Sequence, residues 1–430
     1  MSTADATIAT ACHAEPAAPR RATLAGIAGN VMEWYDFAVY GYFAPIIGRQ
    51  FFPSEDPAAS LVAAFGVFAA GFLMRPIGGL VFGHIGDKVG RKAALTLSVL
   101  AMAIPTFLIG ALPGYALLGA WAAVFLVVLR MIQGLSVGGE YTTSVVFLVE
   151  SAPAGQRGRA GSWSTVGAVA GTLMGSAVGA ALSTIFSVEA IEHWAWRVPF
   201  LLGLGVGLAG LYIRKHIPEP QSIPKSEVAK GSPVLEAFRT EWRAMVQISA
   251  LNVLNAVGFY MAFVYVVTYL EKVARLPISE ALDINTINMV ILLGVLPLAG
   301  SLSDRIGRRP VLMASALAGV VFAWPLFWLI DHPEPLLAFL GQFGFALIIG
   351  GFCGVIPVTM VEAFPARLRC SAISIGYNLC LGVIGGTTPL VATWLIDSTG
   401  IALSPAYYMM VAAAISLATV MTLPHAGASS

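Results

Sequence analysis

Apolar stretches long enough to cross a lipid bilayer recur along the whole sequence, and they limit the possible folds more than any other feature. A helix needs about 20 apolar residues to cross roughly 30 Å of hydrocarbon. Hydrophobic residues make up 57% of the 430 positions and charged residues only 11%, which is more than a soluble core of this length could bury. We therefore expect a membrane protein. Because the stretches lack the alternation of barrel strands, we expect its spans to be α-helices.

Twelve such stretches predict an all-α membrane protein built from two six-helix bundles that are pseudo-repeats of each other. The predicted spans are residues 24–47, 60–82, 93–113, 117–142, 161–184, 198–213, 245–270, 285–303, 311–330, 336–360, 371–396 and 405–423. The predicted organisation is a tail at 1–21, a first bundle at 22–213, a linker at 214–243, a second bundle at 244–424 and a tail at 425–430. The linker ends in Leu235, Phe238 and Trp242, spaced as on one helix face, so this end is either a short helix on the membrane surface or a solvated loop.

The distribution of lysine and arginine predicts the orientation, since loops rich in these residues stay in the cytoplasm. With the N-terminus inside, 18 of the 24 lysines and arginines fall in cytoplasmic segments and four on the opposite side, while Arg75 and Arg130 fall inside predicted spans. We therefore expect a multi-pass protein of the bacterial inner membrane. Both tails and the linker are expected in the cytoplasm.

The remaining composition argues against several other classes of protein. A net charge of +1 gives no support for a nucleic-acid partner, and the four cysteines lack the spacing of metal ligands. Neither a nucleophile elbow nor a phosphate-binding loop occurs in the sequence, so we expect no enzyme, no cofactor and no metal. The expected partners are a small solute, a proton and membrane lipid, and the expected state is a monomer.

A ten-residue segment occurs twice, once in each predicted bundle. Gly83–Lys92, which contains Asp87, recurs as Gly300–Arg309, which contains Asp304, 217 positions later. This offset indicates duplication of a six-span unit. Glycines allow a sharp turn, and a carboxylate at a helix end can pair with a basic residue or with the N-terminus of a neighbouring helix. We predict that these loops gate access, and the alternative is that they only fix the topology. The candidate gating residues are Gly83, Asp87, Gly90, Arg91, Asp304 and Arg308.

This repeated loop resembles the hallmark of the major facilitator superfamily. Four further motifs are similar to those of its metabolite:proton symporters, namely GNVMEWYDF at 29–37, RPIGG at 75–79, QGLSVGGEY at 133–141 and WRVPF at 196–200. The resemblance implies twelve spans, alternating access, and cotransport of a proton with a carboxylate such as citrate, α-ketoglutarate or shikimate, or with proline or betaine. The first-half motifs look closest to the proline/betaine branch. The sequence ends soon after Pro424 and lacks the long C-terminal coiled coil of the osmosensing members, a departure that puts osmosensing in doubt.

Two carboxylates lie midway along the first predicted span. An ionised carboxylate there costs about 2.5–3.5 kcal/mol on insertion scales. Glu33 and Asp36 are three residues apart and share a helix face with Tyr40, which suits proton exchange. Asp36 is the preferred proton site. Glu33 is either its partner or is held in a fixed ion pair by Arg75.

Arg130, in the fourth predicted span, is always charged and needs either a polar cavity or a carboxylate. It is predicted to bind a substrate carboxylate, with Gln133 on the same face and Tyr40 nearby. The open alternative is that Arg130 pairs with Glu33 or Asp36 as a scaffold. Glu140, further toward the cytoplasm, is grouped with Arg75 as a candidate for intramembrane ion pairing.

The second predicted bundle has almost no charge inside its spans, so its candidate solute contacts are neutral. They are Asn252, Asn255, Tyr377 and Asn378. The alternative for each is an interhelical hydrogen bond without a solute.

These features together predict a proton-coupled symporter that imports a small organic acid or zwitterion by alternating access. The substrate classes considered are di- and tricarboxylates, α-keto acids, proline and betaine. The alternatives are a uniporter or exporter of amphipathic compounds and a membrane sensor that does not transport.

Overall fold

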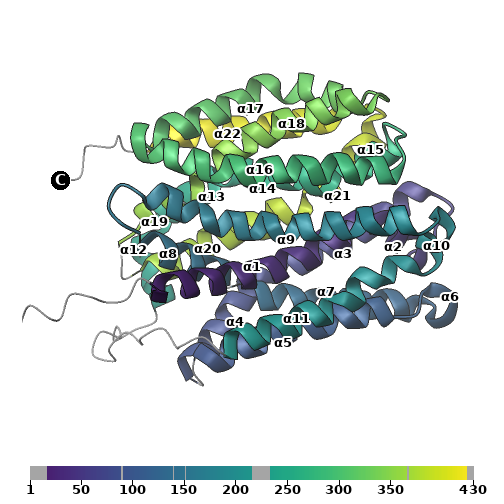
Figure 1. Ribbon diagram of the computed structural model, residues 1–430, viewed down its shortest axis with the longest axis horizontal. Coiled ribbons are helices and arrows are strands. Elements are labelled where there is room, and N and C mark those ends of the chain that lie inside the picture. Colours follow the sequence, from purple (N-terminus) through teal and green to yellow (C-terminus); the bar gives the residue numbers. More distant parts are fainter. Residues whose placement is uncertain are drawn as a thin grey trace, which may run out of the picture.

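The structure is a computed structural model that describes residues 17–88, 91–138, 140–150, 152–215, 233–365 and 368–423. All regular structure within these ranges is helical, and most helices run along the long axis of the molecule (Figure 1).

The first half of the chain is described from α1 to α11. Its elements are α1 (Ala17–Tyr42), α2 (Ala44–Phe51), α3 (Pro57–Leu73), α4 (Arg75–Lys88), α5 (Arg91–Ala111), α6 (Tyr115–Leu118), α7 (Ala120–Val137), α8 (Glu140–Glu150), α9 (Arg157–Ile185), α10 (Val188–His193), the 3₁₀ turn η1 (Ala195–Arg197) and α11 (Val198–Lys215).

The second half is described from α12 to α22. Its elements are α12 (Pro233–Thr240), α13 (Trp242–Leu251), α14 (Val253–Phe259), the π-helical η3 (Tyr260–Tyr265), α15 (Val266–Lys272), α16 (Ile278–Ile306), α17 (Arg308–Ile330), α18 (Pro335–Cys353), α19 (Ile356–Glu362), α20 (Arg369–Cys380), the π-helical η4 (Leu381–Gly385), α21 (Gly386–Thr399) and α22 (Ser404–Met421).

Consecutive helices join into twelve spans, so the predicted all-α membrane fold is confirmed. Nine helical segments of the described chain are long and apolar enough to cross a membrane on their own, and α1 with α2, α5 and α11 complete the twelve. Each predicted span falls on one of these segments. Some helices are longer than predicted. For example, α16 covers 278–306 where 285–303 was expected, because this helix continues past the apolar core of its span into charged residues.

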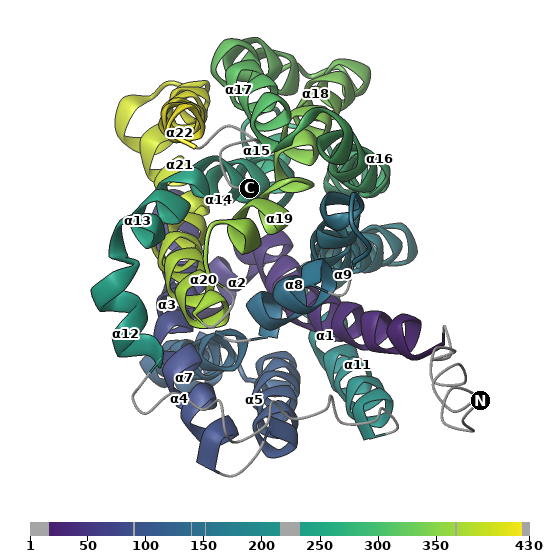
Figure 2. The same ribbon diagram turned by 90° about the vertical axis from the view of Figure 1, so that its left-hand side faces the viewer.

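Both α1 and α3 contact the second half, α1 through η3 and α3 through α21 and η4. The start of α3 is fixed by Asp56, whose carboxylate accepts a hydrogen bond of 2.9 Å from the amide of Ala58, next to Pro57 at the first helical position. Helix α9 lies against α1 and, on its other side, against α16 of the second half (Figure 2). A second large contact between the halves is made by α3 with α21 and η4, and smaller ones are made by α8 and α9 with α19 and by α4 and α8 with α20. The two large contacts enclose the candidate site.

The helix ends that adjoin the repeated loops and the linker gather at one end of the molecule, at the left of Figure 1, where α4, α8, α12 and α19 are labelled. This arrangement agrees with the alternation expected of twelve spans. Which face of the membrane this end occupies stays a prediction, as do the tails and the linker boundaries. Residues 1–16, 216–232 and 424–430 lie outside the described ranges.

The end of the predicted linker forms α12, so the helical alternative is the one observed. Phe238 and Trp242 are about half exposed. Phe238 lies on α12 and Trp242 is the first residue of α13, and large exposed apolar side chains at this junction suit a position on the membrane surface.

Candidate functional site

Asp36 is the centre of a buried polar network inside the first half. Its Oδ2 lies 2.7 Å from Nη1 of Arg130 on α7, and its Oδ1 accepts hydrogen bonds of 2.7 Å from the Thr106 hydroxyl on α5 and 2.8 Å from the Gln133 amide on α7. Gln133 also accepts a bond of 2.8 Å from Arg130. Asp36 is 1% exposed and Arg130 is fully buried. The carboxylate is therefore paired and hydrogen-bonded, as a buried charge must be.

Aromatic rings surround the guanidinium of Arg130. Its carbon lies 4.3 Å from the ring centre of Tyr40, 4.7 Å from that of Phe37 and 5.8 Å from that of Phe68, within the range of cation–π attraction. The Tyr40 hydroxyl donates to the carbonyl of Ala64 at 3.0 Å. All of these groups belong to the first half, so Arg130 makes its contacts within one half.

Glu33 and Arg75 form a second ion pair, and this one reaches the other half. Oε1 of Glu33 lies 3.2 Å from Nη2 of Arg75, and Nε of Arg75 donates to Asn378 Oδ1 of α20 at 3.4 Å. The Asn378 amide donates in turn to the carbonyl of Gly138 at 2.6 Å. Asn378 thus connects α20 of the second half to α4 and α7 of the first.

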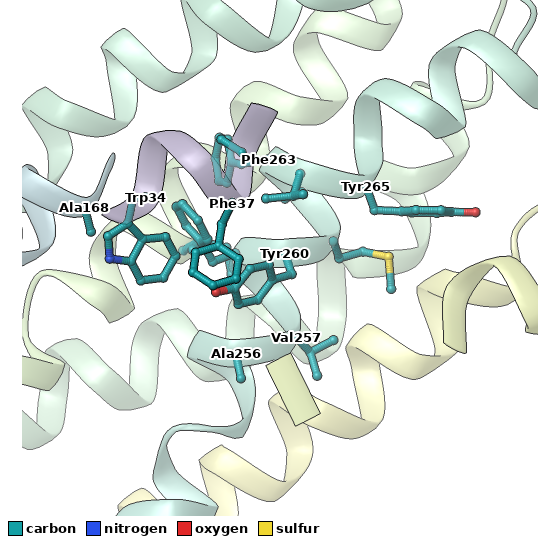
Figure 3. Packing of buried hydrophobic residues seen from close by; sticks show 14 of the residues in the cluster. Trp34, Phe37, Ala168, Ala256, Val257, Tyr260, Phe263 and Tyr265 are labelled. Carbon is teal, nitrogen blue, oxygen red and sulfur yellow. The ribbon is translucent and has the colours of Figure 1, made fainter. Parts of the chain in front are cut away.

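An aromatic cluster lies between the halves beside this pair. Trp34 stacks on Tyr260 with ring centres 6.0 Å apart and planes at 23°, and Tyr260 meets Phe72 edge-on at 5.2 Å. Phe72 contacts Phe37 at 4.3 Å and Phe68 at 4.9 Å. Figure 3 shows Trp34, Phe37 and Tyr260 packed together, with the rings filling the space between their helices. The rings connect the surroundings of Arg75 to those of Arg130.

Two π-helical segments face this cluster from the second half. Tyr260 is the first residue of η3, and η4 packs against α3 and α14 at the same contact. A Cβ atom at Gly385, the last residue of η4, would lie 2.9 Å from the Tyr260 ring, so glycine allows the close approach. Single-turn π segments inside α-helices occur frequently at functional sites, and no pattern in the sequence predicts them.

A small cavity of about 10 Å³ lies beside Asp36, close to the roughly 10–15 Å³ that one water molecule needs. Its lining residues come from α1, α5 and α11, and they are Met32, Tyr35, Asp36, Met102, Ala103, Thr106, Gly203 and Gly207. The cavity therefore approaches Asp36 from the flank of the first half, away from the contact with the second half.

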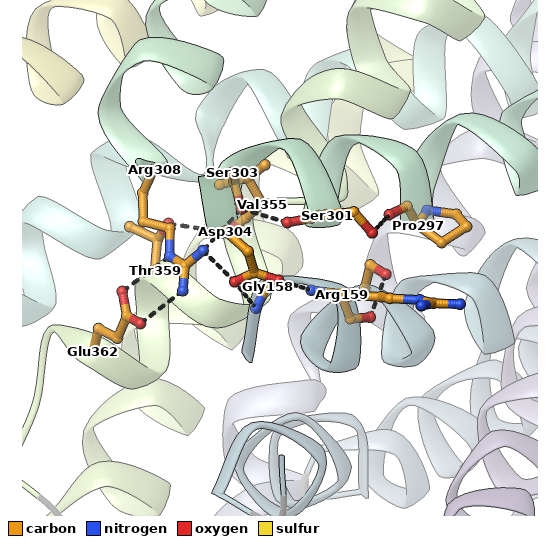
Figure 4. Close-up of polar contacts among 12 residues, drawn as sticks. Gly158, Arg159, Pro297, Ser301, Ser303, Asp304, Arg308, Val355, Thr359 and Glu362 are labelled. Atoms are coloured by element: carbon orange, nitrogen blue, oxygen red, sulfur yellow. Dashed lines mark hydrogen bonds and ion pairs between the residues drawn. The ribbon is translucent and has the colours of Figure 1, made fainter. Parts of the chain in front are cut away.

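A polar lock holds the halves together at the loop end. The Asp304 carboxylate accepts hydrogen bonds from the amides of Gly158 at 2.8 Å and Arg159 at 2.9 Å, at the first turn of α9. Arg308 lies 2.7 Å from Asp304 and forms two bonds to Glu362, at 3.1 and 3.2 Å. Figure 4 shows this group, which we call the loop-end lock. Glu150 and Arg369 form a further ion pair between the halves.

Hydrogen bonds also connect the halves at the opposite end. The Tyr42 hydroxyl of α1 donates to the carbonyl of Phe263 at 2.9 Å and accepts from Asn285 of α16 at 3.0 Å. Ser176 of α9 and Thr286 of α16 share a hydrogen bond of 2.7 Å. With both ends joined, the described structure represents a closed arrangement of the two halves.

The predicted site residues fall into separate groups. Asp36, Arg130, Gln133 and Tyr40 come together in the first half, while Glu33, Arg75 and Asn378 come together between the halves. Tyr377 stacks on Tyr141 at 4.8 Å, also between the halves. For Arg130, the contact observed is with Asp36, which was the open alternative to a substrate carboxylate. Arg75 is paired with Glu33.

The remaining predicted residues lie elsewhere or are not described. Asn255 donates to Asn252 at 3.0 Å and accepts from the Cys353 thiol at 2.9 Å, and Asn252 donates to its own helix, so both make interhelical or local contacts. Asp304 and Arg308 belong to the loop-end lock. Gly90 lies outside the described residues. For four further candidates only the helical backbone is described, and these are Gly83, Asp87, Arg91 and Glu140.

Sequence reasoning missed several residues of both groups. Thr106 donates to Asp36, yet a threonine in an apolar span carries no charge that marks it. Trp34 and Phe72 were not among the candidate site residues. A signal did exist for Trp34, since it lies inside the motif that also contains Glu33 and Asp36.

Comparisons with known proteins gave matches that cover most of the chain. Residues 27–375 match the family model described as Major Facilitator Superfamily. A proline/betaine transporter of Salmonella typhimurium is 38% identical over 412 residues, which cover 93% of this chain and 82% of that protein. A glycine betaine/proline/ectoine/pipecolic acid transporter of Dickeya dadantii has the same identity and coverage. The solved structure of the proton:xylose symporter XylE superposes with a TM-score of 0.74 at 17% identity, covering 94% of each chain.

Proposed function

Because this chain belongs to the major facilitator superfamily, we propose that it is a proton-coupled importer of a compact zwitterion such as proline or glycine betaine. The family assignment makes it a multi-pass secondary transporter of a small molecule rather than an enzyme. The direction of transport, the proton coupling and the substrate are the proposal.

The substrate class is supported by what the relatives carry. The two curated relatives are named for proline, betaine, ectoine and pipecolic acid, which are small molecules that combine a carboxylate with a positively charged nitrogen. A di- or tricarboxylate would need excess positive charge between the halves. Beside the aromatic cluster, the charges of Glu33 and Arg75 balance each other. We therefore favour a zwitterion over the organic acids.

The proton coupling is supported by one observation above all, the buried carboxylate of Asp36 with its three donors. A proton on Asp36 would remove the negative charge that pairs with Arg130 and add a hydroxyl donor to a group that only accepts in the described network. The network then has to rearrange. Since Asp36 lies on the same helix as Glu33 and Trp34, less than one turn away, the rearrangement reaches the contact between the halves directly.

Coupling requires that the proton and the solute favour the same conformational exchange, because a ligand shifts an equilibrium only through differential affinity. In the proposed cycle, the closed arrangement passes to an open one when either the loop-end lock or the Tyr42 contacts separate. The two halves rock about the aromatic cluster. The transporter changes between its arrangements when it carries both the proton and the solute or neither of them, and it does not change when it carries only one. We place the loop-end lock at the cytoplasmic face and both termini in the cytoplasm.

The test is uptake into proteoliposomes that contain the purified full-length protein and an internal pH-sensitive dye. Addition of proline or glycine betaine should acidify the interior together with solute entry, and an imposed inward proton gradient should drive accumulation. Solute entry without a dye response, and with no accumulation under the gradient, would favour the uniporter. Absence of entry for both compounds would overturn the proposed substrate class.

A further inference from the structure

We propose that the carboxylate of the transported zwitterion binds Arg75 and Tyr260, between the two halves, and that its charged nitrogen lies against Trp34. The inference rests on the proposed function, since it assumes that a compact zwitterion is carried. It replaces Arg130 as the anion contact that the sequence suggested.

Arg75 and Tyr260 both hold a buried donor that has no hydrogen-bond partner in the described part of the chain. Arg75 is 0% exposed, and with Nη2 on Glu33 and Nε on Asn378, its Nη1 has no acceptor. The Tyr260 hydroxyl is in the same situation at 1% exposure. A buried donor without an acceptor costs free energy. A carboxylate supplies two acceptor oxygens and forms strong bonds with such donors.

The Arg75 guanidinium and the Tyr260 ring both lie against the ring of Phe72. The guanidinium carbon of Arg75 is 5.2 Å from the centre of this ring, and the Tyr260 ring centre is also 5.2 Å from it. Arg75 belongs to α4 of the first half, while Tyr260 belongs to η3 of the second. A carboxylate held by both would therefore touch both halves, and its affinity would change whenever they rock.

The nitrogen end of the zwitterion finds an aromatic surface beside these donors. Trp34 is stacked with Tyr260 and meets Phe259 edge-on at 5.4 Å. A quaternary ammonium is attracted to the face of such rings within about 6 Å of the ring centre. The neighbouring carboxylate of Glu33 adds a negative charge. In the closed arrangement the rings occupy this space, so binding requires Trp34 and Tyr260 to move apart.

Arg130 has two donors without an acceptor as well, Nε and Nη2, but its surroundings argue against a substrate site. Its charge is paired with Asp36 at 2.7 Å, and the rings of Phe37 and Tyr40 cover it. All of these groups belong to the first half. A ligand that contacts one half only gains little differential affinity from rocking, which a coupled substrate needs.

The two π-helical segments are an independent observation at the same place. Tyr260 begins η3, and Gly385 of η4 lies against its ring. A π turn is less regular than the α-helix and can change its register locally. Both segments can thus reposition Tyr260 when the ligand enters.

The experiment measures binding to the purified full-length protein by calorimetry, using glycine betaine and its methyl ester, which keeps the quaternary nitrogen but has no free carboxylate. Tyr260→Phe removes only a hydroxyl without a described partner, and Arg75→Lys keeps a charge opposite Glu33. Each variant should weaken glycine betaine binding by about tenfold or more, and each should reduce the preference for glycine betaine over the ester. Tyr265→Phe, which removes the other hydroxyl of η3, should bind as the wild type does.

The outcomes separate this inference from the proposed function. Unchanged affinities in Tyr260→Phe and Arg75→Lys, together with weaker binding in Arg130→Lys, would overturn the inference while leaving the proposed function intact. An equal loss for glycine betaine and its ester would also overturn it. A wild-type protein that neither binds nor transports a compact zwitterion would overturn both. If Arg75→Lys does not fold, Tyr260→Phe decides alone.

Discussion

The backbone amide of Gly158 donates a hydrogen bond of 2.8 Å to the carboxylate of Asp304, so the N-terminus of a first-half helix is held by a side chain of the second half. A negative charge is favoured at this position because unpaired amides and the helix dipole both point toward it. The contact cannot persist when the halves separate at this end. Its strength therefore contributes to the free-energy difference between the closed arrangement and the one that opens here.

Replacement of Asp304 by asparagine should favour the open arrangement at the loop end. Asp304→Asn removes the negative charge that accepts hydrogen bonds from the first turn of α9 and pairs with Arg308. Hydrogen bonds to a charged group contribute about 1.5–3 kcal/mol each to stability. Cys353 provides a native reporter, because it is buried and its carbonyl accepts a bond of 3.3 Å from Thr165 of the other half. Its labelling by a thiol reagent should become about tenfold faster.

Two controls belong to this labelling experiment, which uses a background with Cys12 and Cys370 replaced by alanine. Cys380, a buried thiol on α20, should label at the wild-type rate if opening is confined to the contact between the halves. Asp331→Asn removes a carboxylate that accepts from Tyr269 at 3.0 Å within the second half, and should leave Cys353 labelling unchanged. Faster labelling of both thiols would indicate general unfolding instead.

Substitution of Gly158 by alanine should open the same end without any change of charge. A Cβ atom there would lie 2.5 Å from the carbonyl oxygen of Gly300 and 2.6 Å from the hydroxyl of Ser303, so α9 and α16 have to move apart. We expect Gly158→Ala to increase Cys353 labelling as Asp304→Asn does. Gly294→Ala on α16 is the matched control, because a Cβ atom at Gly294 meets nothing within 4 Å. Labelling at the wild-type rate in Gly158→Ala would show that this close approach does not hold the end closed.

Loss of the Tyr42 hydroxyl should favour opening at the other end. Tyr42→Phe removes bonds to Phe263 and Asn285, each contributing about 0.5–1.5 kcal/mol. With more of the protein open to the outside, external substrate should bind a few-fold more tightly in right-side-out vesicles. Tyr35→Phe is the control, since its hydroxyl donates to Pro199 within the first half at 2.8 Å. An equal effect of both variants would exclude a role specific to the contact between the halves.

Replacement of Asp36 by asparagine should uncouple solute movement from the proton. Asp36→Asn keeps the size of the side chain and an oxygen acceptor for Arg130, so the protein should remain folded. Loss of the buried ion pair should lower its free energy of unfolding by about 3–5 kcal/mol. Proteoliposomes should still exchange labelled solute at equal concentrations while failing to accumulate it under a proton gradient. The parallel Glu33→Gln variant identifies the titrating group. If it, and not Asp36→Asn, abolishes accumulation, Glu33 carries the proton.

The fold could be predicted because its dominant constraint, the length of hydrocarbon to be crossed, is written directly into the sequence as apolar stretches. The partners of the buried charges could not, because they depend on how each helix is rotated about its axis. Residues 33 and 36 are only three positions apart, yet Glu33 pairs with Arg75 and Asp36 with Arg130. Sequence spacing allowed several pairings, and only the rotation of α1 about its axis, which brings Glu33 to Arg75 of α4 and Asp36 to Arg130 of α7, selects between them.

The aromatic cluster was beyond sequence analysis for a different reason. Trp34, Phe72 and Tyr260 come from distant spans and have no spacing relationship to one another. In the sequence of an apolar helix, an aromatic residue that lines a binding site cannot be told apart from one that faces lipid. The role of the repeated loops was easier to predict, because a carboxylate that recurs at the same position of a helix end has few structural uses. One of these uses is to accept hydrogen bonds at the N-terminus of a neighbouring helix, and Asp304 does this at α9.

Under the proposed coupling, the small cavity beside Asp36 separates the place where a proton would approach from the place where the solute would bind. Its lining belongs to α1, α5 and α11, which are helices of the first half. The cavity therefore lies on the side of the Asp36 carboxylate that faces away from the contact between the halves. A proton that travels by this flank need not wait for the halves to part, and the solute never has to pass the carboxylate. In such a carrier the timing of protonation is set by breathing motions inside one bundle, and the timing of solute release by the movement of two bundles against each other.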